Sequence, residues 1–322
     1  MIFFADQAWF YLSARDALLT GHLPLLGITA SITWLHQGPL WTYLLIPGLA
    51  LTNFHPLSGS FLAIIFSLPT PFLLYFFAKR LWGKSAAVTA VLLFTLNPWF
   101  LLVHSNLAYH TTPIFLFTLV FFWCLIKKHD FLTGLFLGLL YQLHLLTFIF
   151  WPIMLFRRRL IPGFILGIIP FLLAGPIQSF GIFIWLAKKA FEGFSGTGVL
   201  SDAYLVVVYI PAVLMISWLV SKLSRPIGIL LIVILLGIGI WNFKLDRYGP
   251  SLSSRIALSE AILSESRTAT PELIMQGPGA KFRSYGMPYE YLIWWLSRAS
   301  FPSGPHSKFL IHEQAQTYEV LE

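Results

Sequence analysis

Apolar residues in this chain occur in long uninterrupted blocks rather than in helical or alternating stripes. Most blocks are close to the ~20 residues that a helix needs to cross a bilayer, although the first and the fourth are short. Short basic clusters separate them: KRLWGK at 79–84, KKHD at 127–130, RRR at 157–159 and SKLSR at 221–225. The pattern predicts membrane-crossing helices over 39–53, 60–78, 85–103, 112–126, 160–178, 204–221 and 226–243.

The segment 131–156 is ambiguous because it is long for one crossing and short for two. As one helix it would be about 39 Å long, whereas two crossings of a ~30 Å core need about 60 Å. With a hairpin, ten Lys/Arg of the short loops fall on one side and three on the other; with a single pass the division is seven against six. The tendency of basic loops to remain in the cytoplasm favours a hairpin that turns near YQLH, with Gln142 and His144 at membrane depth.

Composition agrees with a membrane protein, since 57% of the residues are hydrophobic and only 11% are charged. We expect an all-α polytopic membrane protein, a helical bundle of about seven to nine membrane segments. Residues 1–243 contain thirteen Lys/Arg against five Asp/Glu and so carry the whole net charge of +8. That bias is typical of loops that flank a membrane, and we expect no nucleic-acid partner. The single cysteine, Cys124, excludes an internal disulfide and a thiolate cage for a metal.

The chain after residue 243 has a different character, with eight Lys/Arg balanced by eight Asp/Glu. Helical spacing in 251–266 and 287–300, and strand patterns in ELIMQG and KFLIHE, predict a small α/β cap. We therefore predict two domains, a membrane domain over 1–243 and an extracytoplasmic cap over 244–322. Residues 1–38 form an external loop with an interface helix, and 104–111 and 179–203 are external as well. The opening MIFF resembles the end of a preceding span, so we expect further chain upstream of Met1.

Asp6 is the first candidate for chemistry, and the sequence leaves two interpretations of it open. It precedes a helix-prone segment rich in aromatic residues, DQAWFYLSARDALLTG, where an aspartate suits the helix N-cap. A carboxylate at the mouth of a membrane cavity can also take a proton from an attacking hydroxyl group. Spacing alone supports both interpretations equally.

Three other polar groups stand at or near the predicted external face. His36 and Gln37 precede Gly38-Pro39, which breaks the chain before a span, and alone they indicate ordinary interfacial polarity. The loop HSNLAYHTT contains His104, Asn106, Tyr109 and His110, but it has no nearby acid or cysteine to complete a metal site. Gln142 and His144 in the hairpin either face a cavity or join two helices by a hydrogen bond.

These segments resemble a known family. ADQAWFYLSARDALLTGHLPLLG and HQGPLWTYLLIPGLAL resemble the first external loop and the next span of membrane glycosyltransferases of the GT-C class. The nearest resemblance is to glycosyltransferase family 39, the dolichyl-phosphate-mannose–protein mannosyltransferase-like group, in its bacterial and archaeal branches. LNPWFLLVHSNLAYHTTPIFLF is similar to a later loop of that family, and GLFLGLLYQLHLLTFIFWP to its hairpin. The resemblance covers about residues 3 to 180.

The resemblance implies an integral plasma-membrane enzyme whose active site lies outside the cytoplasm. It implies a sugar donor carried on a polyprenyl phosphate, transfer with inversion to an acceptor protein, lipid or glycan, and Asp6 as general base. The donor is a substrate; no cofactor is implied, and a divalent metal is left open. Substrate-binding residues carried over or inferred from position are Arg15, His36, Gln37, Asn106, His110, Gln142 and His144.

Two departures from the family concern the donor phosphate. Many members have a Lys before the PPL-type sequence that begins the next span, where this chain has His36, Gln37 and Gly38. Many also have an Arg in the later external loop, where Asn106 is the nearest position. The alternative function is a transporter or flippase of a lipid-linked substrate, although the sequence contains no internal repeat of the kind that many transporters show. A non-catalytic membrane scaffold is the third possibility.

Overall fold

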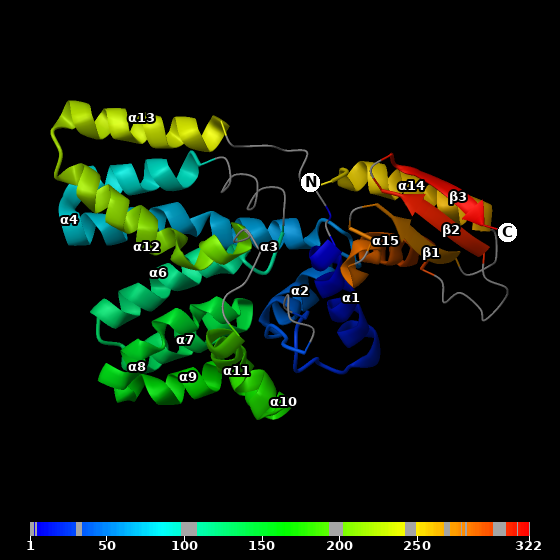
Figure 1. Ribbon diagram of the computed structural model, residues 1–322, viewed down its shortest axis with the longest axis horizontal. Helices are drawn as coiled ribbons and strands as arrows, with labels where there is room; N and C mark the ends of the chain where they lie inside the picture. The colour runs from blue at the N-terminus through cyan, green and yellow to red at the C-terminus, as the bar shows by residue number, and fades with distance from the viewer. Residues whose placement is uncertain are drawn as a thin grey trace.

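The computed structural model describes residues 3, 5–29, 34–97, 108–192, 202–241, 249–266, 271–277, 279–280, 282–298, 307–313 and 315–321. Across these ranges the chain is mostly helical, with a small three-stranded sheet near its C-terminus. A helical bundle occupies one end of the long axis and the cap containing the sheet occupies the other (Figure 1). All three strands of the sheet come from residues after 243.

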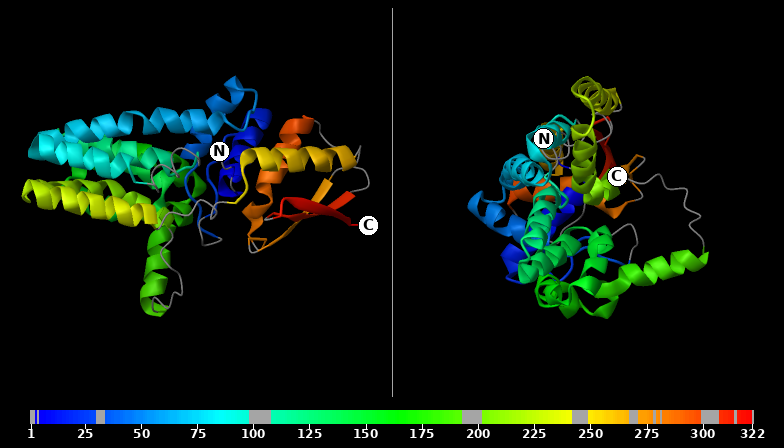
Figure 2. Two further views of the ribbon diagram at one scale, coloured as in Figure 1. Left: turned by 90° about the horizontal axis from the view of Figure 1, so that it is seen from above. Right: turned by 90° about the vertical axis from the view of Figure 1, so that its left-hand side faces the viewer.

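The bundle is built from long helices joined by short ones. Its first half contains α1 (Ala5–Thr20), α2 (Leu40–Leu51), α3 (Ser58–Ser67), α4 (Pro69–Thr95) and α6 (Thr112–Ile126). Its second half contains α7 (Asp130–Leu143), η1 (Leu145–Phe150), α8 (Pro152–Phe156), η2 (Arg158–Leu160), α9 (Ile161–Gly167), α10 (Ile169–Ala174), α11 (Pro176–Glu192), α12 (Asp202–Ser221) and α13 (Arg225–Trp241). Most run along the long axis of the molecule, whereas α11 projects sideways from the bundle (Figure 2).

Helix α4 contains a turn at Gly83. This glycine has φ 87° and ψ −177°, outside the helical region, so the chain reverses and the two limbs of α4 lie side by side (Figures 1 and 2). The prediction of separate helices on either side of KRLWGK is confirmed. Within the described residues, one continuous helical stretch, Ser58–Thr95, is long and apolar enough to cross a membrane, and it includes this turn.

The predicted hairpin in 131–156 is confirmed as a change of direction of the chain. Helix α7 ends at Leu143, His144 is extended (φ −154°, ψ 120°), and η1 and α8 then return. The guanidinium of Arg157 consequently lies 3.7 Å from the Asp130 carboxylate and donates a hydrogen bond of 2.9 Å to the Leu125 carbonyl. The start and the end of the segment therefore meet at one end of the bundle.

The prediction of one helix over 160–178 is wrong. Ile168 leaves the helical region (φ −111°, ψ 14°) and Gly175 has φ 107°, so the segment divides into α9, α10 and the start of α11. Each of these helices has a proline in its first turn, at Pro162, Pro170 and Pro176. A proline lacks the N–H that would continue a preceding helix, which explains the breaks in an otherwise apolar run.

The closest packing in the bundle joins α7 to α9 through two pairs of glycines. Gly134 and Gly138 face Gly163 and Gly167, and each pair is separated by three residues. A Cβ on Gly138 would lie 2.7 Å from the Phe164 carbonyl oxygen and 2.8 Å from Gly167 Cα. Two small-xxx-small faces that bring backbones into contact are typical of helix pairs in membranes.

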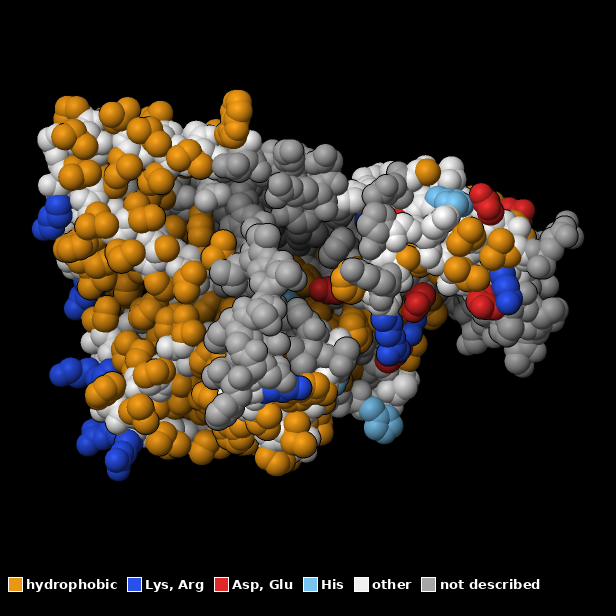
Figure 3. All heavy atoms as spheres, viewed as in Figure 1, with side chains coloured by type: hydrophobic (Ala, Val, Ile, Leu, Met, Phe, Trp, Pro, Cys, Tyr) orange, Lys and Arg blue, Asp and Glu red, His pale blue; other side chains and the backbone are white. Residues whose placement is uncertain are grey.

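The surface of the bundle is apolar along its length and basic at one end. Large exposed hydrophobic side chains occur on α3, α4, α9, α12 and α13. The turn of α4, the α6–α7 turn, the α8–η2 segment and the α12–α13 turn lie at the end away from the cap, and Lys and Arg side chains gather there (Figures 1 and 3). These four turns contain the four basic clusters of the sequence. An apolar girdle with cations at one rim is the distribution expected of a protein set in a bilayer.

The cap consists of α14 (Leu252–Ser266), β1 (Pro271–Gln276), η4 (Arg283–Tyr285), α15 (Met287–Ser297), β2 (Ser307–His312) and β3 (Thr317–Leu321). Strand β2 is central, with β1 parallel and β3 antiparallel to it. The helices and the first two strands fall where the sequence predicted them, and β3 was not predicted. Phe309 and Ile311 of β2 pack on one face of α15, beside Tyr289 and Ile293.

The opposite face of α15 belongs to the core of the bundle. Tyr291 lies edge-on to Tyr11 of α1, with ring centroids 5.2 Å apart, and donates a hydrogen bond of 2.7 Å to the Phe54 carbonyl. Arg298 donates to the carbonyl of Asn53 over 2.7 Å. Helix α1 is therefore packed between the bundle and the cap, and much of its surface is buried rather than open to a membrane interface.

Candidate functional site

Asp6 lies in the first turn of α1, and its carboxylate is held by the segment that precedes α6. The Tyr109 hydroxyl donates a hydrogen bond of 2.8 Å to Asp6 Oδ2. Helix α1 begins at Ala5, so Asp6 is inside the helix and the N-cap interpretation is wrong by position. A carboxylate in a first turn is still favoured by the helix dipole. Asp6 is partly exposed, which leaves it open to a ligand.

Two histidines continue from Tyr109 into the bundle. The rings of Tyr109 and His110 have centroids 4.0 Å apart, and the ring of His110 lies parallel to that of His144 at 6.3 Å. His110 is 2% exposed and His144 is 6% exposed. Neither ring nitrogen of His110 has a hydrogen-bond partner among the described residues. Burial, together with the neighbouring His144, lowers the pKa of His110 well below its usual value.

The end of α7 fixes the position of His144. His144 is the extended residue at which α7 stops, and its Nδ1 accepts a hydrogen bond of 3.3 Å from the Leu146 N–H. The Thr147 hydroxyl donates to the His144 carbonyl over 2.9 Å. The hairpin turn therefore presents an imidazole toward the segment that contains His110.

Gln142 is a buried polar residue whose hydrogen bonds connect separate segments of the bundle. Its side-chain amide donates to the Gly167 carbonyl, and its backbone carbonyl accepts a hydrogen bond of 2.8 Å from the Gly38 N–H. Gly38 lies so close to Gln142 that a Cβ on the glycine would be 2.5 Å from Gln142 Cβ. Gln142 thus joins the glycine-lined α7–α9 pair to the loop before α2, which favours the interhelical interpretation of this residue.

His36 and Gln37 lie in that same loop and are positioned by their backbones. The Gln37 N–H donates to the Ile28 carbonyl over 2.9 Å, and its carbonyl accepts from Gly27 at 2.8 Å. The His36 N–H donates to Gln178 Oε1 over 3.2 Å. His36 Nδ1 and Gln37 Oε1 are buried and have no hydrogen-bond partner within the described part of the chain. Both side chains therefore have unused hydrogen-bonding capacity.

Arg15 is not part of this group. Its guanidinium forms an ion pair of 2.6 Å with the neighbouring Asp16 and stacks on the Trp294 ring at 4.9 Å. It stands nine residues after Asp6 on α1, about 13 Å along the helix axis at ~1.5 Å per residue. Arg15 contacts the cap, so the prediction that it shares a site with Asp6 has no support in the arrangement of side chains.

The structure brings together some of the predicted residues and separates others. Asp6, His110 and His144 form one connected group through Tyr109, whereas Gln142, Gln37 and His36 are joined to it through the backbone beside His144. Asn106 and His104 lie outside the described residues. Gln178 was missed, because a lone polar residue in an apolar segment gives no sign of a partner far away in the sequence.

The chemistry available to this group is that of one partly exposed carboxylate, a tyrosine hydroxyl and two buried imidazoles. Among the described residues, no three of His, Cys, Asp and Glu are arranged to hold a metal ion. No known protein family, curated protein or solved structure matches this chain. A proposal for its function therefore depends on the site and on the sequence resemblance.

Proposed function

We propose that this chain is a membrane-embedded glycosyltransferase of the GT-C type, which moves a sugar from a polyprenyl-phosphate donor to an acceptor hydroxyl group. The observation that carries the proposal is the Asp6–Tyr109 hydrogen bond of 2.8 Å, which holds a partly exposed carboxylate at the end of the bundle away from its basic turns. The family resemblance assigns general-base chemistry to this same aspartate. The wider classification as a protein with several membrane spans is part of the proposal.

The reaction needs one proton acceptor at the acceptor side. As the acceptor oxygen forms a bond to C1 of the sugar, its proton passes to the Asp6 carboxylate. The bond from C1 to the phosphate oxygen breaks, and the polyprenyl phosphate leaves with the electron pair. Attack opposite the leaving group inverts the configuration at C1. The Tyr109 hydroxyl orients the carboxylate and leaves its second oxygen as the proton acceptor in this scheme.

The distribution of charge supports the proposed side of the membrane. Lys and Arg gather at the end of the bundle distant from the cap (Figure 3). Because basic loops tend to remain in the cytoplasm, the opposite end, with Asp6 and the cap, is assigned to the extracytoplasmic side. A donor that faces away from the cytoplasm would meet Asp6 there. His36 and Gln37, with their unused polar atoms, are the proposed contacts for donor or acceptor groups.

The test is Asp6→Asn in membranes that contain the protein, with radiolabelled polyprenyl-phosphate sugars as donors. Asn keeps the size of the side chain and accepts the Tyr109 hydrogen bond, but it does not take up a proton. We expect transfer to fall roughly 10²–10⁴-fold with little change in donor binding. Tyr109→Phe should lower transfer less, because it leaves the base in place and removes only its orienting bond.

Asp16→Asn is the matched control. Asp16 lies on the same helix, is exposed, and makes its described ion pair with Arg15 on the cap side. It should keep wild-type transfer. A folded Asp6→Asn protein that transfers sugar at the wild-type rate would end the assignment of Asp6 as the base. Wild-type membranes that transfer no sugar from any such donor would instead remove the proposed function.

A further inference from the structure

We propose that a groove on the outside of α8–α11 binds an anionic phospholipid of the leaflet at the basic end of the bundle. One acyl chain would lie in the groove, and the phosphate would lie on the arginines next to it. The proposal depends on the placement in a membrane, and it is independent of the glycosyl-transfer reaction.

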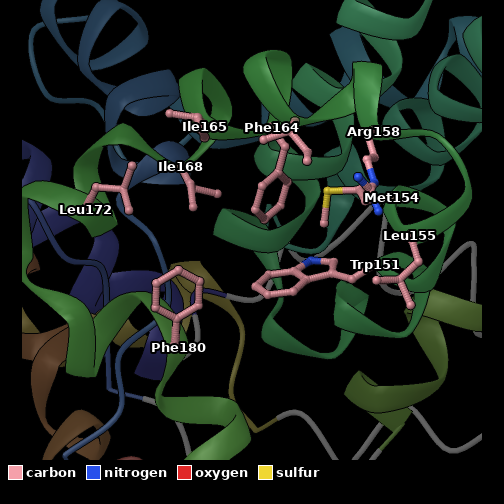
Figure 4. Close-up of a pocket in the computed structure, with 10 residues that line it drawn as sticks. Trp151, Met154, Leu155, Arg158, Phe164, Ile165, Ile168, Leu172 and Phe180 are labelled. Carbon is pink, nitrogen blue, oxygen red and sulfur yellow. The ribbon is translucent and has the colours of Figure 1, made fainter.

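The groove is apolar and belongs to a different part of the bundle from Asp6. It has a volume of about 500 Å³. It is lined by Trp151, Met154, Leu155, Arg158, Ile161, Phe164, Ile165, Ile168, Leu172 and Phe180. Arg158 and Leu155 stand at one end of the groove, and Leu172 and Phe180 stand at the other (Figure 4). An elongated apolar space with one charged end has the shape and polarity of a lipid chain and its headgroup.

A second hollow begins where the apolar one ends, and it supplies the charge. Leu155 and Arg158 line both hollows. The second has a volume of about 590 Å³ and is also lined by Lys128, Asp130, Phe156, Arg157 and Arg159. Four cations and one carboxylate therefore line this hollow. Such a basic pocket beside membrane helices at the cytoplasmic rim is suited to an anionic lipid headgroup.

Most of these cations are not used by the protein itself. Arg157 pairs with Asp130 and with the Leu125 carbonyl, which neutralises the only acid of the hollow. Arg158, Arg159 and Lys128 are exposed and make no side-chain hydrogen bond or ion pair among the described residues. A phosphate monoanion or diester would complement this charge, whereas a zwitterionic headgroup would bring its own cation.

The side chains around the arginines support insertion at headgroup depth. Phe156 is 88% exposed and Leu155 is 76% exposed, directly before the three arginines. Large apolar side chains beside basic ones are typical of segments that lie at the level of lipid headgroups. The ring of Trp151 also lines the groove, where an aromatic side chain can pack against an acyl chain. Charge and apolar exposure thus point to a phospholipid rather than to a soluble anion.

The experiment measures lipid contact with Trp151. The purified full chain is placed in phosphatidylcholine vesicles, and phosphatidylglycerol or phosphatidylcholine with brominated acyl chains is added in increasing amounts. Quenching that disappears in Trp151→Phe reports lipid in the groove. We expect the wild type to be quenched by brominated phosphatidylglycerol at a lower mole fraction than by brominated phosphatidylcholine.

Two double variants separate the groove from general surface charge. Arg158→Gln with Arg159→Gln should reduce the preference for phosphatidylglycerol about 25-fold, or about fivefold for each cation removed. Lys222→Gln with Arg225→Gln removes two cations from the same end of the bundle, away from the groove, and should leave the preference unchanged. Leu172→Phe adds bulk at the far end of the groove without adding a second indole, and should reduce quenching of Trp151 without a change in charge.

Three results would overturn the proposal. The first is a wild-type protein with no preference between the two lipids. The second is an equal loss in both double variants, which would show a general surface potential. The third is competition by soluble glycerol phosphate, which would show a simple anion site. If sugar transfer fails while this preference holds, only the proposed function is lost.

Discussion

At the scale of single residues, the bundle contains few polar side chains, and some of them pair with a residue from a distant segment. Asp6 and Tyr109 come from distant segments and meet through one hydrogen bond of 2.8 Å. In the cap, Arg255 and Glu313 form a buried ion pair that also includes the Tyr289 hydroxyl. His110 differs, because its ring is buried with both nitrogens unpaired among the described residues. A fall in pH should therefore act on this residue.

Acid should destabilise the protein through His110. Burial lowers the pKa of this histidine, so the folded protein holds it neutral while the unfolded chain takes up a proton near its ordinary value of ~6.5. Stability is then complete above that value and is lost as the pH falls below it. We expect the thermal midpoint in detergent to fall as the pH is lowered from about 7 to about 5. His110→Asn should make this fall smaller, because up to about one proton fewer is taken up when the protein unfolds.

His22→Asn is the control for removing one histidine, since His22 stands on the exposed loop after α1. A pH dependence that is identical in wild type and His110→Asn would show that His110 gains a partner, or is accessible to solvent, in the folded protein.

At the scale of elements, the close crossing of α7 and α9 determines where the hairpin residues lie. The four glycines let two backbones touch, and Gln142 then donates its hydrogen bond to Gly167. His144 follows two residues later, at the end of α7. A side chain introduced at the crossing would therefore move the polar end of the hairpin as well as weaken the pair.

Gly138→Leu should destabilise the bundle. Its Cβ would lie 2.7 Å from the Phe164 carbonyl oxygen. Both are fixed by the backbone, so no side-chain rotation can relieve the clash. Overpacking typically costs about 1–3 kcal/mol, and a backbone clash should be at the upper end of that range. The measurement is the thermal midpoint of the purified protein in detergent. Gly237→Leu on α13 has nothing within 4 Å of its Cβ and should leave the midpoint unchanged; equal effects of the two would refute a specific crossing.

At the scale of the whole molecule, the distribution of charge defines two ends. The four basic turns gather at one end and the cap packs against α1 at the other (Figures 1 and 3). Helix α15 shares its two faces between the cap sheet and the bundle core. The cap is therefore packed directly on α1, the helix that carries Asp6.

Thiol labelling tests this polarity. Cys124 is the only cysteine of the chain and is buried, so Cys124→Ser provides a background. Ser253→Cys on the exposed face of α14 should react with an impermeant reagent added to intact cells, and Ser85→Cys at the α4 turn should react only after permeabilisation. The reverse pattern would place the cap and Asp6 in the cytoplasm and would contradict the proposed direction of transfer.

Much of the helical layout was predictable because apolar runs and their breaks are local properties. The helix over 112–126 coincides with α6, and the basic turns at Gly83 and Ser224 end helices as expected. The prediction over 160–178 was wrong because it assumed that an unbroken apolar run forms an unbroken helix. Pro162 and Pro170 interrupt the backbone hydrogen bonds of that run. Strand β3 was missed because its sequence, TYEVL, is short and acquires a partner only when β2 is beside it.

The sequence alone determined the helical class, the separate cap, the basic clusters and the turn near His144, since composition and chain breaks act over a few residues. Only the tertiary structure decided which polar residues meet. In the folded protein, Asp6 accepts a hydrogen bond from Tyr109, and the ring of His110 lies parallel to that of His144. Arg15 instead contacts Trp294 on the cap side. The physical reason is that these contacts depend on how helices cross. That geometry is set by backbone approach at glycines such as Gly138 and by packing between segments far apart in the chain, which no local pattern records.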